Sequence, residues 1–352
     1  MADKILEFFK DLVYKNREHM IYVAISPERV DRKDDYVKLV EGKHYIRLYL
    51  AEMYLKKQVQ FLVNWFPLVQ SLVNFQMGSE LVDVPNVADA SRVGAQKHGT
   101  GDVIARNYVM TPLIPFNSGV VQLSAALIGA QGDNILKDFI STLSEFSKLL
   151  AVPQFSAALS LAGPLTTGLQ NLINGPGKLH LGLNDTFSVN SQGGYYAAVR
   201  ATEEEVDKSK LRVEDNHLRI VDGNDTKPFD LFDYMLFRVE VTTDRNDWDS
   251  LGRIQEPLGQ ARKAYADLNE ELADANYRKA LLAVREAPEL TTADRIRVSL
   301  LIKEDYKKLK EDLNFAGLLP GEFSLNQSMI DAIGVDEALE KGEPTFSDLV
   351  SF

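Results

Sequence analysis

The stretch NYVMTPLIPFNSGVVQLSAALIGAQG, residues 107–132, contains no charged residue and opens the part of the chain that decides the fold. It begins a longer segment, residues 107–177, which holds only five charges, whereas the other 281 residues hold 85. Residues 149–177 form a second window without charge. Because charged side chains are seldom fully buried, a segment this poor in charge is expected to be hidden from water. We therefore expect the rest of the chain to cover it or to be attached to it.

Around this segment several stretches have the β-rich pattern typical of strands, and two of them, His44–Tyr54 and Leu68–Met77, also alternate between two faces as half-buried strands do. The segments with this pattern are Met20–Ser26, His44–Tyr54, Leu68–Met77, Ser118–Leu127, Tyr195–Ala201 and Tyr234–Thr243. Asp215-Asn216 separates two shorter strand-like segments, and both residues tolerate the positive φ angles of a tight turn. We expect an antiparallel sheet or sandwich, with residues 78–101 as a long surface loop.

Helical spacing begins at Asn134, where hydrophobic residues recur every three or four positions. This spacing predicts a buried helical hairpin over about residues 134–174. A short amphipathic helix is predicted over residues 3–18. Three more helices are predicted near the C-terminus, and the last starts after a capping-box-like segment from Thr291 to Asp294. Their predicted ranges are 258–272, 275–285 and 293–313.

Together these elements predict an α+β fold in which the sheet packs against the helical hairpin and a C-terminal helical module follows. The predicted division is an α+β core domain over residues 1–250, a helical module over 251–313 and an acidic tail over 314–352. The tail contains seven acidic residues and one lysine, so half of the net charge of −12 lies there. We expect this tail to be weakly structured and accessible.

Composition argues against several classes of function. The negative charge would repel a phosphate backbone, so we expect no nucleic-acid partner. The absence of cysteine rules out disulfides, zinc–thiolate sites, iron–sulfur clusters and cysteine nucleophiles. The N-terminal residues lack the continuous apolar core of a signal peptide, so we expect a cytoplasmic location. The sequence does not indicate an oligomeric state.

The candidate metal site is a group of acidic residues around the segment Tyr234–Thr243. Oxygen ligands of this kind suit Ca²⁺ or Mg²⁺. The match to known metal-binding patterns is poor, however, because Glu240 lacks the lysine that nuclease strands place two residues later, and the following loop lacks the order of an EF-hand. We favour structural turns and helix caps over a metal site. The candidate ligands are Asp222, Asp230, Glu240, Asp244, Asp247 and Asp249.

Three hypotheses for the function remain open. The first is a non-enzymatic, cytoplasmic, microbial protein-interaction or regulatory component that engages another protein through its helical module or acidic tail. The second is a membrane-active effector that releases the charge-poor hairpin, residues 134–177, on activation; Pro153 and Pro164 make this segment too interrupted for a permanent transmembrane helix. The third is a divalent-metal-dependent hydrolase that uses Asp222, Asp230 and Glu240. No strong catalytic motif supports an enzyme.

Overall fold

The computed structural model describes residues 20–56, 59–60, 63–89, 96–98, 101–103, 107–131, 178–188 and 190–313. The chain divides into two compact units, Met1–Thr242 and Thr243–Phe352, called here the sandwich unit and the helical unit. The division falls before the predicted boundary at residue 250, because Trp248 and Leu251 belong to the hydrophobic core of the helices. The predicted hairpin (about 134–174), N-terminal helix and acidic tail lie outside the described residues.

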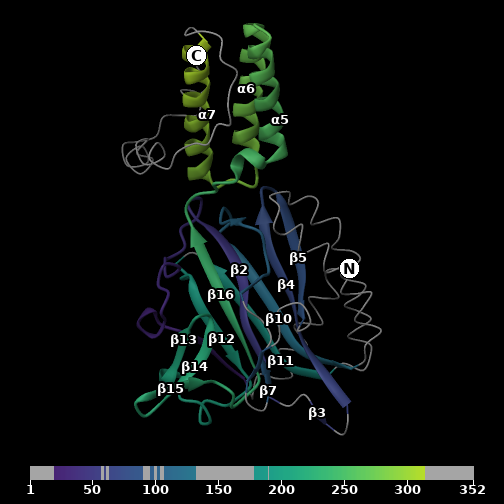
Figure 1. Ribbon diagram of the computed structural model, residues 1–352, viewed down its shortest axis with the longest axis vertical. Helices are drawn as coiled ribbons and strands as arrows, with labels where there is room; N and C mark the ends of the chain where they lie inside the picture. Colours follow the sequence, from purple (N-terminus) through teal and green to yellow (C-terminus); the bar gives the residue numbers. More distant parts are fainter. Residues whose placement is uncertain are drawn as a thin grey trace. The chain divides into compact units, whose positions relative to one another are not determined.

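The larger sheet of the sandwich unit has eight strands, and all of its strand pairs are antiparallel (Figure 1). Its order is β1 (Ile21–Ala24), β12 (Gly194–Val199), β16 (Tyr234–Thr242), β2 (Tyr45–Leu55), β7 (Gly101–Val103) and β6 (Gln96–His98), while β8 (Tyr108–Val109) and β9 (Ile114–Pro115) also pair with β2. The two long central strands, β2 and β16, are therefore contributed by distant parts of the sequence. The register between them shifts at Leu236/Phe237.

The second sheet has five strands and is also antiparallel. Its order is β11 (Lys178–Ser188), β10 (Val120–Gln131), β4 (Val63–Met77) and β3 (Val59–Gln60), with β5 (Glu80–Asp89) paired to β4. The strand β5 corrects the prediction of a surface loop over residues 78–101. Pro85 lies within this strand, and a proline is tolerated in a strand with a free edge; β4 is the only described partner of β5.

A third, smaller sheet is formed by β13 (Leu211–Glu214), β14 (His217–Asp222) and β15 (Asp225–Pro228). Asp215 and Asn216 join the first two strands with φ angles of 52° and 65°. The predicted tight turn is confirmed, because two consecutive positive φ angles match the right-handed twist of a two-residue hairpin. Two short 3₁₀ helices, η2 (Pro27–Arg29) and η3 (Lys208–Lys210), complete the described part of this unit.

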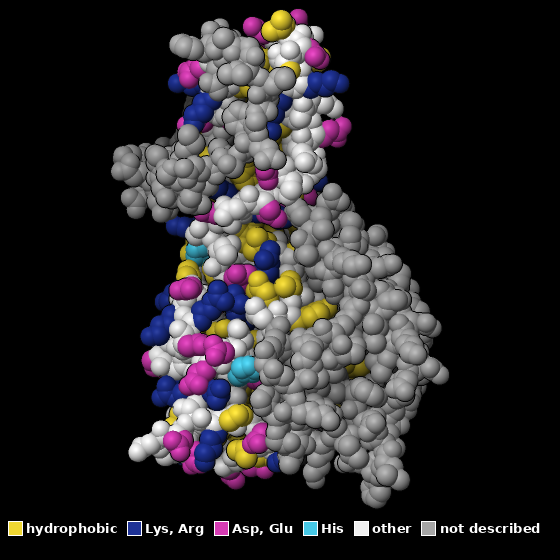
Figure 2. Space-filling model, in the orientation of Figure 1, with side chains coloured by type: hydrophobic (Ala, Val, Ile, Leu, Met, Phe, Trp, Pro, Cys, Tyr) yellow, Lys and Arg dark blue, Asp and Glu magenta, His cyan; other side chains and the backbone are white. Residues whose placement is uncertain are grey.

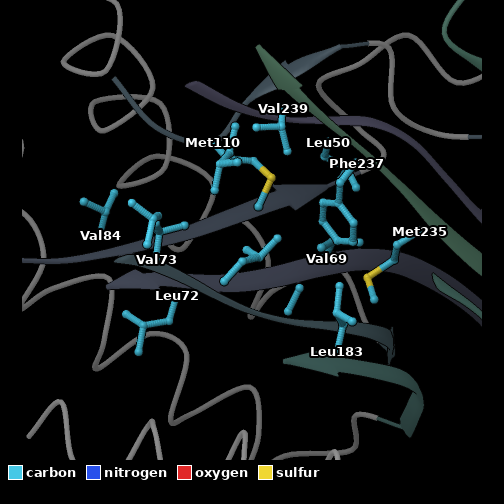
Figure 3. Close-up of a cluster of buried hydrophobic side chains, with 14 of the residues drawn as sticks. Leu50, Val69, Leu72, Val73, Val84, Met110, Leu183, Met235, Phe237 and Val239 are labelled. Carbon is cyan, nitrogen blue, oxygen red and sulfur yellow. The ribbon is translucent and has the colours of Figure 1, made fainter. Parts of the chain in front are cut away.

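The main hydrophobic core lies between the two large sheets, which makes the unit a sandwich (Figure 3). Leu50, Phe237 and Val239 project from the eight-stranded sheet toward Val69 and Val73 of the five-stranded sheet. All five are at most 1% exposed. Burying a side chain of this size stabilises the fold by about 1.5–3 kcal/mol, so this interface is the chief source of stability for the unit.

A second core covers the opposite face of the eight-stranded sheet. There Val199, Tyr234 and Leu236 pack with Val213 and Leu218 of the small sheet. The central strands β2 and β16 are consequently buried on both faces. This explains why their sequences, YIRLYLAEMYL and YMLFRVEVT, contain apolar residues at both odd and even positions.

The helical unit contains η4 (Trp248–Ser250), α5 (Gly252–Ala266), α6 (Glu270–Glu286) and α7 (Thr292–Leu313). Trp248, Ile254, Tyr277, Val284 and Leu301 share one buried cluster. The predicted start of the last helix is confirmed, since the Thr291 hydroxyl accepts a hydrogen bond from the Asp294 backbone N–H at 3.1 Å. No helix in the described ranges is both long enough and apolar enough to span a membrane. The α+β fold with its C-terminal helices is thus as predicted.

Candidate functional site

Three of the predicted metal ligands lie in the sandwich unit. The Asp222 carboxylate, at the end of β14, accepts a hydrogen bond from the Lys227 ammonium at 2.7 Å. This bond lowers the pKa of Asp222, with the charge of Lys227 adding to the effect. Glu240, on β16, accepts a hydrogen bond from the Tyr49 hydroxyl at 2.7 Å. Asp230 is an exposed residue after β15. Asp222 and Glu240 thus each have a partner within the protein.

The other three candidates lie in the segment that begins the helical unit. Asp244 forms an ion pair with Arg297 at 3.6 Å, and Asp247 accepts a hydrogen bond from Arg245 at 2.9 Å. Asp249 lies within η4. Across the described ranges of the chain, no group of three or more histidine, aspartate and glutamate side chains could hold a metal ion.

A buried polar cluster centred on Glu52 joins the small sheet to the eight-stranded sheet. Glu52 lies on β2 opposite the register shift of β16 and is only 2% exposed. Its carboxylate accepts hydrogen bonds from the Leu218 backbone N–H at 2.7 Å and from the Tyr234 hydroxyl at 2.6 Å. Its other oxygen lies 2.6 Å from Nδ1 of His217. The single carboxylate therefore holds two groups of β14 and one of β16.

The Glu52 cluster has a clear structural role. Burial, followed by the nearby charge of Glu52, raises the pKa of Tyr234 well above its ordinary value, so this hydroxyl stays protonated and keeps donating. A carboxylate that orients an imidazole is also part of several catalytic sites. Within the described residues, however, the only side-chain partner recorded for His217 is Glu52. The simplest role for the cluster is to hold β14 against the eight-stranded sheet.

A second buried cluster surrounds Arg238 on β16. The guanidinium donates to the Asp35 carboxylate at 2.7 Å and to the Asn107 side-chain oxygen at 3.1 Å. It lies 4.6 Å from the centre of the Tyr49 ring and 3.5 Å from Glu240. Arg238 and Asp35 are 3% and 6% exposed, so both charges are desolvated and depend on each other. The cluster fixes the loops around residues 35 and 107 to the sheet.

Comparisons with known protein families, curated proteins and solved structures give no match for this chain. The geometry of its own residues is therefore the basis for a functional proposal. In the sandwich unit, the two buried polar clusters, around Glu52 and Arg238, bind other residues of the same unit. The helical unit differs, because one of its ends carries large apolar side chains that are exposed among the residues the structure describes.

The base of the helical unit is fixed by a cluster of buried charges. Asp294, in the first turn of α7, accepts hydrogen bonds from the Arg245 backbone N–H and the Arg297 guanidinium. The Arg297 guanidinium also donates to the Arg245 backbone oxygen at 3.1 Å. Arg245 and Arg297 are each 2% exposed. These bonds attach the segment around Arg245, which precedes η4, to the start of α7, so this end of the unit is rigid.

The opposite end of the unit is the turn between α5 and α6. The Leu268 N–H donates to the Tyr265 carbonyl at 3.0 Å, and the Asn269 N–H donates to the Ala264 carbonyl at 2.9 Å. This pair of bonds is the Schellman motif, whose left-handed position normally holds glycine or asparagine. Here the position holds Leu268, with a φ of 59°. Asn269 also caps α6, since its side chain accepts a bond from the Leu272 N–H at 3.1 Å.

The surface at this end is both apolar and acidic. Leu268 is 82% exposed and Leu272 is 48% exposed. Asp267, Glu270 and Glu271 are exposed beside them in sequence. Figure 2 shows hydrophobic and acidic side chains at the end of the helical unit that carries this turn, at the top of the view. We call these five residues the turn surface.

The sequence contains a signal for each of these two features. Glu52 is the single acidic residue in a strand that is mostly apolar, and a carboxylate at such a place indicates a buried partner. The segment Asp267-Leu-Asn-Glu-Glu271 resembles a helix end followed by an asparagine cap. Hydrophobic periodicity instead extended the first predicted helix to residue 272, six residues beyond its observed end at Ala266.

Proposed function

We propose that this chain is a non-enzymatic protein-interaction component in which the sandwich unit is a scaffold and the C-terminal part engages another protein. The observation that supports this most directly is the turn surface, an exposed apolar and acidic end on a helical unit that has a hydrophobic core of its own. Apolar surface that is exposed and bordered by polar residues is a common feature of protein interaction sites. The cytoplasmic and microbial setting expected from the sequence is part of this proposal.

The buried clusters of the sandwich unit support a scaffold role. Glu52 and Arg238 hold strands and loops in place through several hydrogen bonds each. Buried polar groups that are satisfied in this way make the surrounding structure rigid, because breaking one partnership leaves another group unpaired. A rigid sandwich suits a component that presents a recognition element.

Two truncations of a tagged chain test this proposal. One ends at Thr242 and lacks the entire helical unit, and the other ends at Leu313 and lacks only the acidic tail. Proteins that co-purify from the natural host are compared by quantitative mass spectrometry, and circular dichroism checks that each truncated chain is folded. We expect partners to be lost from the shorter chain. Retention by the longer one assigns binding to the helices, whereas loss from both assigns it to the tail. An unchanged set of partners in both would overturn the proposal.

A further inference from the structure

The turn between β14 and β15 contains the single aspartate–glycine pair of the chain, Asp222-Gly223. Asp222 ends β14 and pairs in register with Asp225, the first residue of β15. Gly223 has a φ of 64°, which suits glycine in a tight hairpin turn. An aspartate in this position has a reaction of its own. The backbone nitrogen of a following glycine, which lacks a Cβ atom, can approach the aspartate side chain with little steric hindrance.

Both reacting groups are accessible in the structure. The Asp222 side chain is 68% exposed. Apart from the neighbours of Gly223 in the chain, no heavy atom of the described residues lies within 4 Å of the place that a Cβ atom on this glycine would take. All four residues of β15 are exposed, and β14 is its only partner among the described strands. This end of the hairpin can therefore open locally, which brings the glycine nitrogen to the carboxyl carbon.

One contact opposes the reaction. The Asp222 carboxylate accepts a hydrogen bond from the Lys227 ammonium at 2.7 Å, across the hairpin. This bond lowers the pKa of Asp222, and the charges of Lys227 and, to a smaller extent, of Lys210 add to the effect. Asp225 is the acidic neighbour of Asp222 in the ladder. Attack by a backbone nitrogen needs the protonated acid, because the acid loses water, whereas a carboxylate has no good leaving group. Lys227 thus holds Asp222 in its unreactive form.

We propose that Asp222 is a site of spontaneous isoaspartate formation, and that the Lys227 contact slows the reaction by keeping the carboxylate charged. The Gly223 nitrogen forms a bond to the side-chain carboxyl carbon, the N–H proton joins the departing hydroxyl, and one water molecule leaves. Another water molecule then opens the resulting succinimide ring at either carbonyl. Opening at the backbone carbonyl leaves the chain running through the side-chain carbons of residue 222, with a free carboxylate on its Cα atom.

The product changes the edge of the small sheet. The backbone gains one methylene group at residue 222, so the register with Asp225 is lost at this end of the ladder. The new carboxylate lies on a different carbon from the one that accepts the bond from Lys227. Each conversion therefore removes the ion pair and loosens the β14–β15 hairpin.

The test incubates the folded, full-length chain in water enriched in heavy oxygen. Each ring opening inserts one heavy oxygen atom, and after digestion the isoaspartate peptide separates from the aspartate peptide by chromatography and is sequenced by mass spectrometry. The internal control is Asp225, which is exposed on the same hairpin but precedes Thr226, whose branched side chain hinders attack. We expect label at residue 222 and none at residue 225. An unlabelled residue 222, after a time in which the urea-unfolded chain becomes labelled there, would overturn the proposal.

Lys227→Gln tests the restraint, with Lys227→Arg as the matched variant that keeps the charge. At neutral pH we expect labelling of residue 222 to be several-fold faster in the glutamine variant and close to wild type in the arginine variant, with circular dichroism confirming that both are folded. As pH falls toward the ordinary pKa of an aspartate, about 3.9, the rates of the glutamine variant and wild type are expected to converge. Equal rates at neutral pH would rule out a restraint by Lys227. A ratio of rates that stays constant with pH would show that charge is not its cause.

Discussion

His44 makes the sandwich unit sensitive to acid. Its Nδ1 accepts a hydrogen bond from the Val40 backbone N–H at 3.0 Å, and the residue is 4% exposed. Burial, together with the neighbouring charge of Lys43, lowers the pKa of His44 below its ordinary value. As pH falls below about 6.5, the unfolded chain takes up a proton at this histidine that the folded chain does not, so stability is lost.

We therefore expect the free energy of unfolding to fall between pH 7 and pH 5, and to fall less steeply in His44→Asn, which has no group that titrates in this range. Urea denaturation at a series of pH values measures both slopes. Because His44→Asn also removes a packed ring, its stability at pH 7 is expected to be lower. Identical slopes in the two proteins would show that His44 does not contribute to the pH dependence.

Glu52→Gln tests the cluster that attaches the small sheet. A glutamine has the same shape but carries no charge and accepts hydrogen bonds at only one terminal atom, so the bonds from Leu218 and Tyr234 become weaker and Nδ1 of His217 faces an amide N–H₂. We expect a loss of about 3 kcal/mol in the free energy of unfolding. The matched control is Asp225→Asn, an exposed change on β15 that is expected to stay within about 0.5 kcal/mol of wild type. Similar values for both variants would contradict this role for Glu52.

The buried side-chain contacts could not be predicted from the sequence, because the residues that form them are far apart along the chain. Glu52 and His217 are separated by 165 positions, and Asp35 and Arg238 by 203. No local pattern links such residues. The candidate metal ligands lie close together in the sequence, but the direction of each side chain decides what it binds. The structure pairs Asp222 with Lys227 across a tight turn and Glu240 with Tyr49 on the neighbouring strand.

Among the elements, the α5–α6 turn allows a comparison of two substitutions at one position. Leu268→Gly removes the strain of the left-handed conformation, whereas Leu268→Ala keeps a Cβ atom and hence most of that strain. We expect the glycine variant to be more stable than the alanine variant by about 1 kcal/mol. Thermal and urea unfolding of the full chain, followed by helical circular dichroism, measure the difference. If alanine is as stable as glycine, the backbone at this position is not strained.

Elements that depend on local signals were predicted well, and those that depend on neighbouring elements were not. The hairpin at Asp215-Asn216 follows from two residues that tolerate positive φ, and the start of α7 follows from the Thr291 cap. The strand β5 was missed because Pro85 is compatible with a strand only when one of its edges is free. The end of α5 was placed too late because helical periodicity continues through the turn.

At the scale of the whole molecule, the two units are expected to unfold separately, because each has its own hydrophobic core. The chain contains two tryptophans, Trp65 in β4 and Trp248 in the helical unit. Trp65→Phe leaves a reporter for the helical unit alone, and Trp248→Phe leaves one for the sandwich unit. We expect the helical unit to unfold at the lower urea concentration, since a small core gives marginal stability. Coincident fluorescence transitions in the two variants would show that the units unfold as one.

The fold class could be predicted from the alternating and helical periodicities, but the strand order could not. The pattern in YMLFRVEVT identifies a strand and does not state that it lies between β12 and β2. Burial on both faces places apolar residues at odd and even positions of β2 and β16, so their sequences do not show which face meets which sheet. Strand order and the choice of face depend on how well segments that are distant in the sequence pack together.

The central position of β16 also sets the order of events during synthesis. β2 is complete at residue 55, but the strand that pairs along its length ends at residue 242. At ordinary rates of translation, the intervening residues take roughly ten to forty seconds to leave the ribosome. During that time the eight-stranded sheet cannot be completed. The edges of β2 and β12 that later pair with β16 have unpaired backbone N–H and C=O groups, which can pair with other chains and cause aggregation. We therefore expect the nascent chain to be prone to aggregation until β16 has been made.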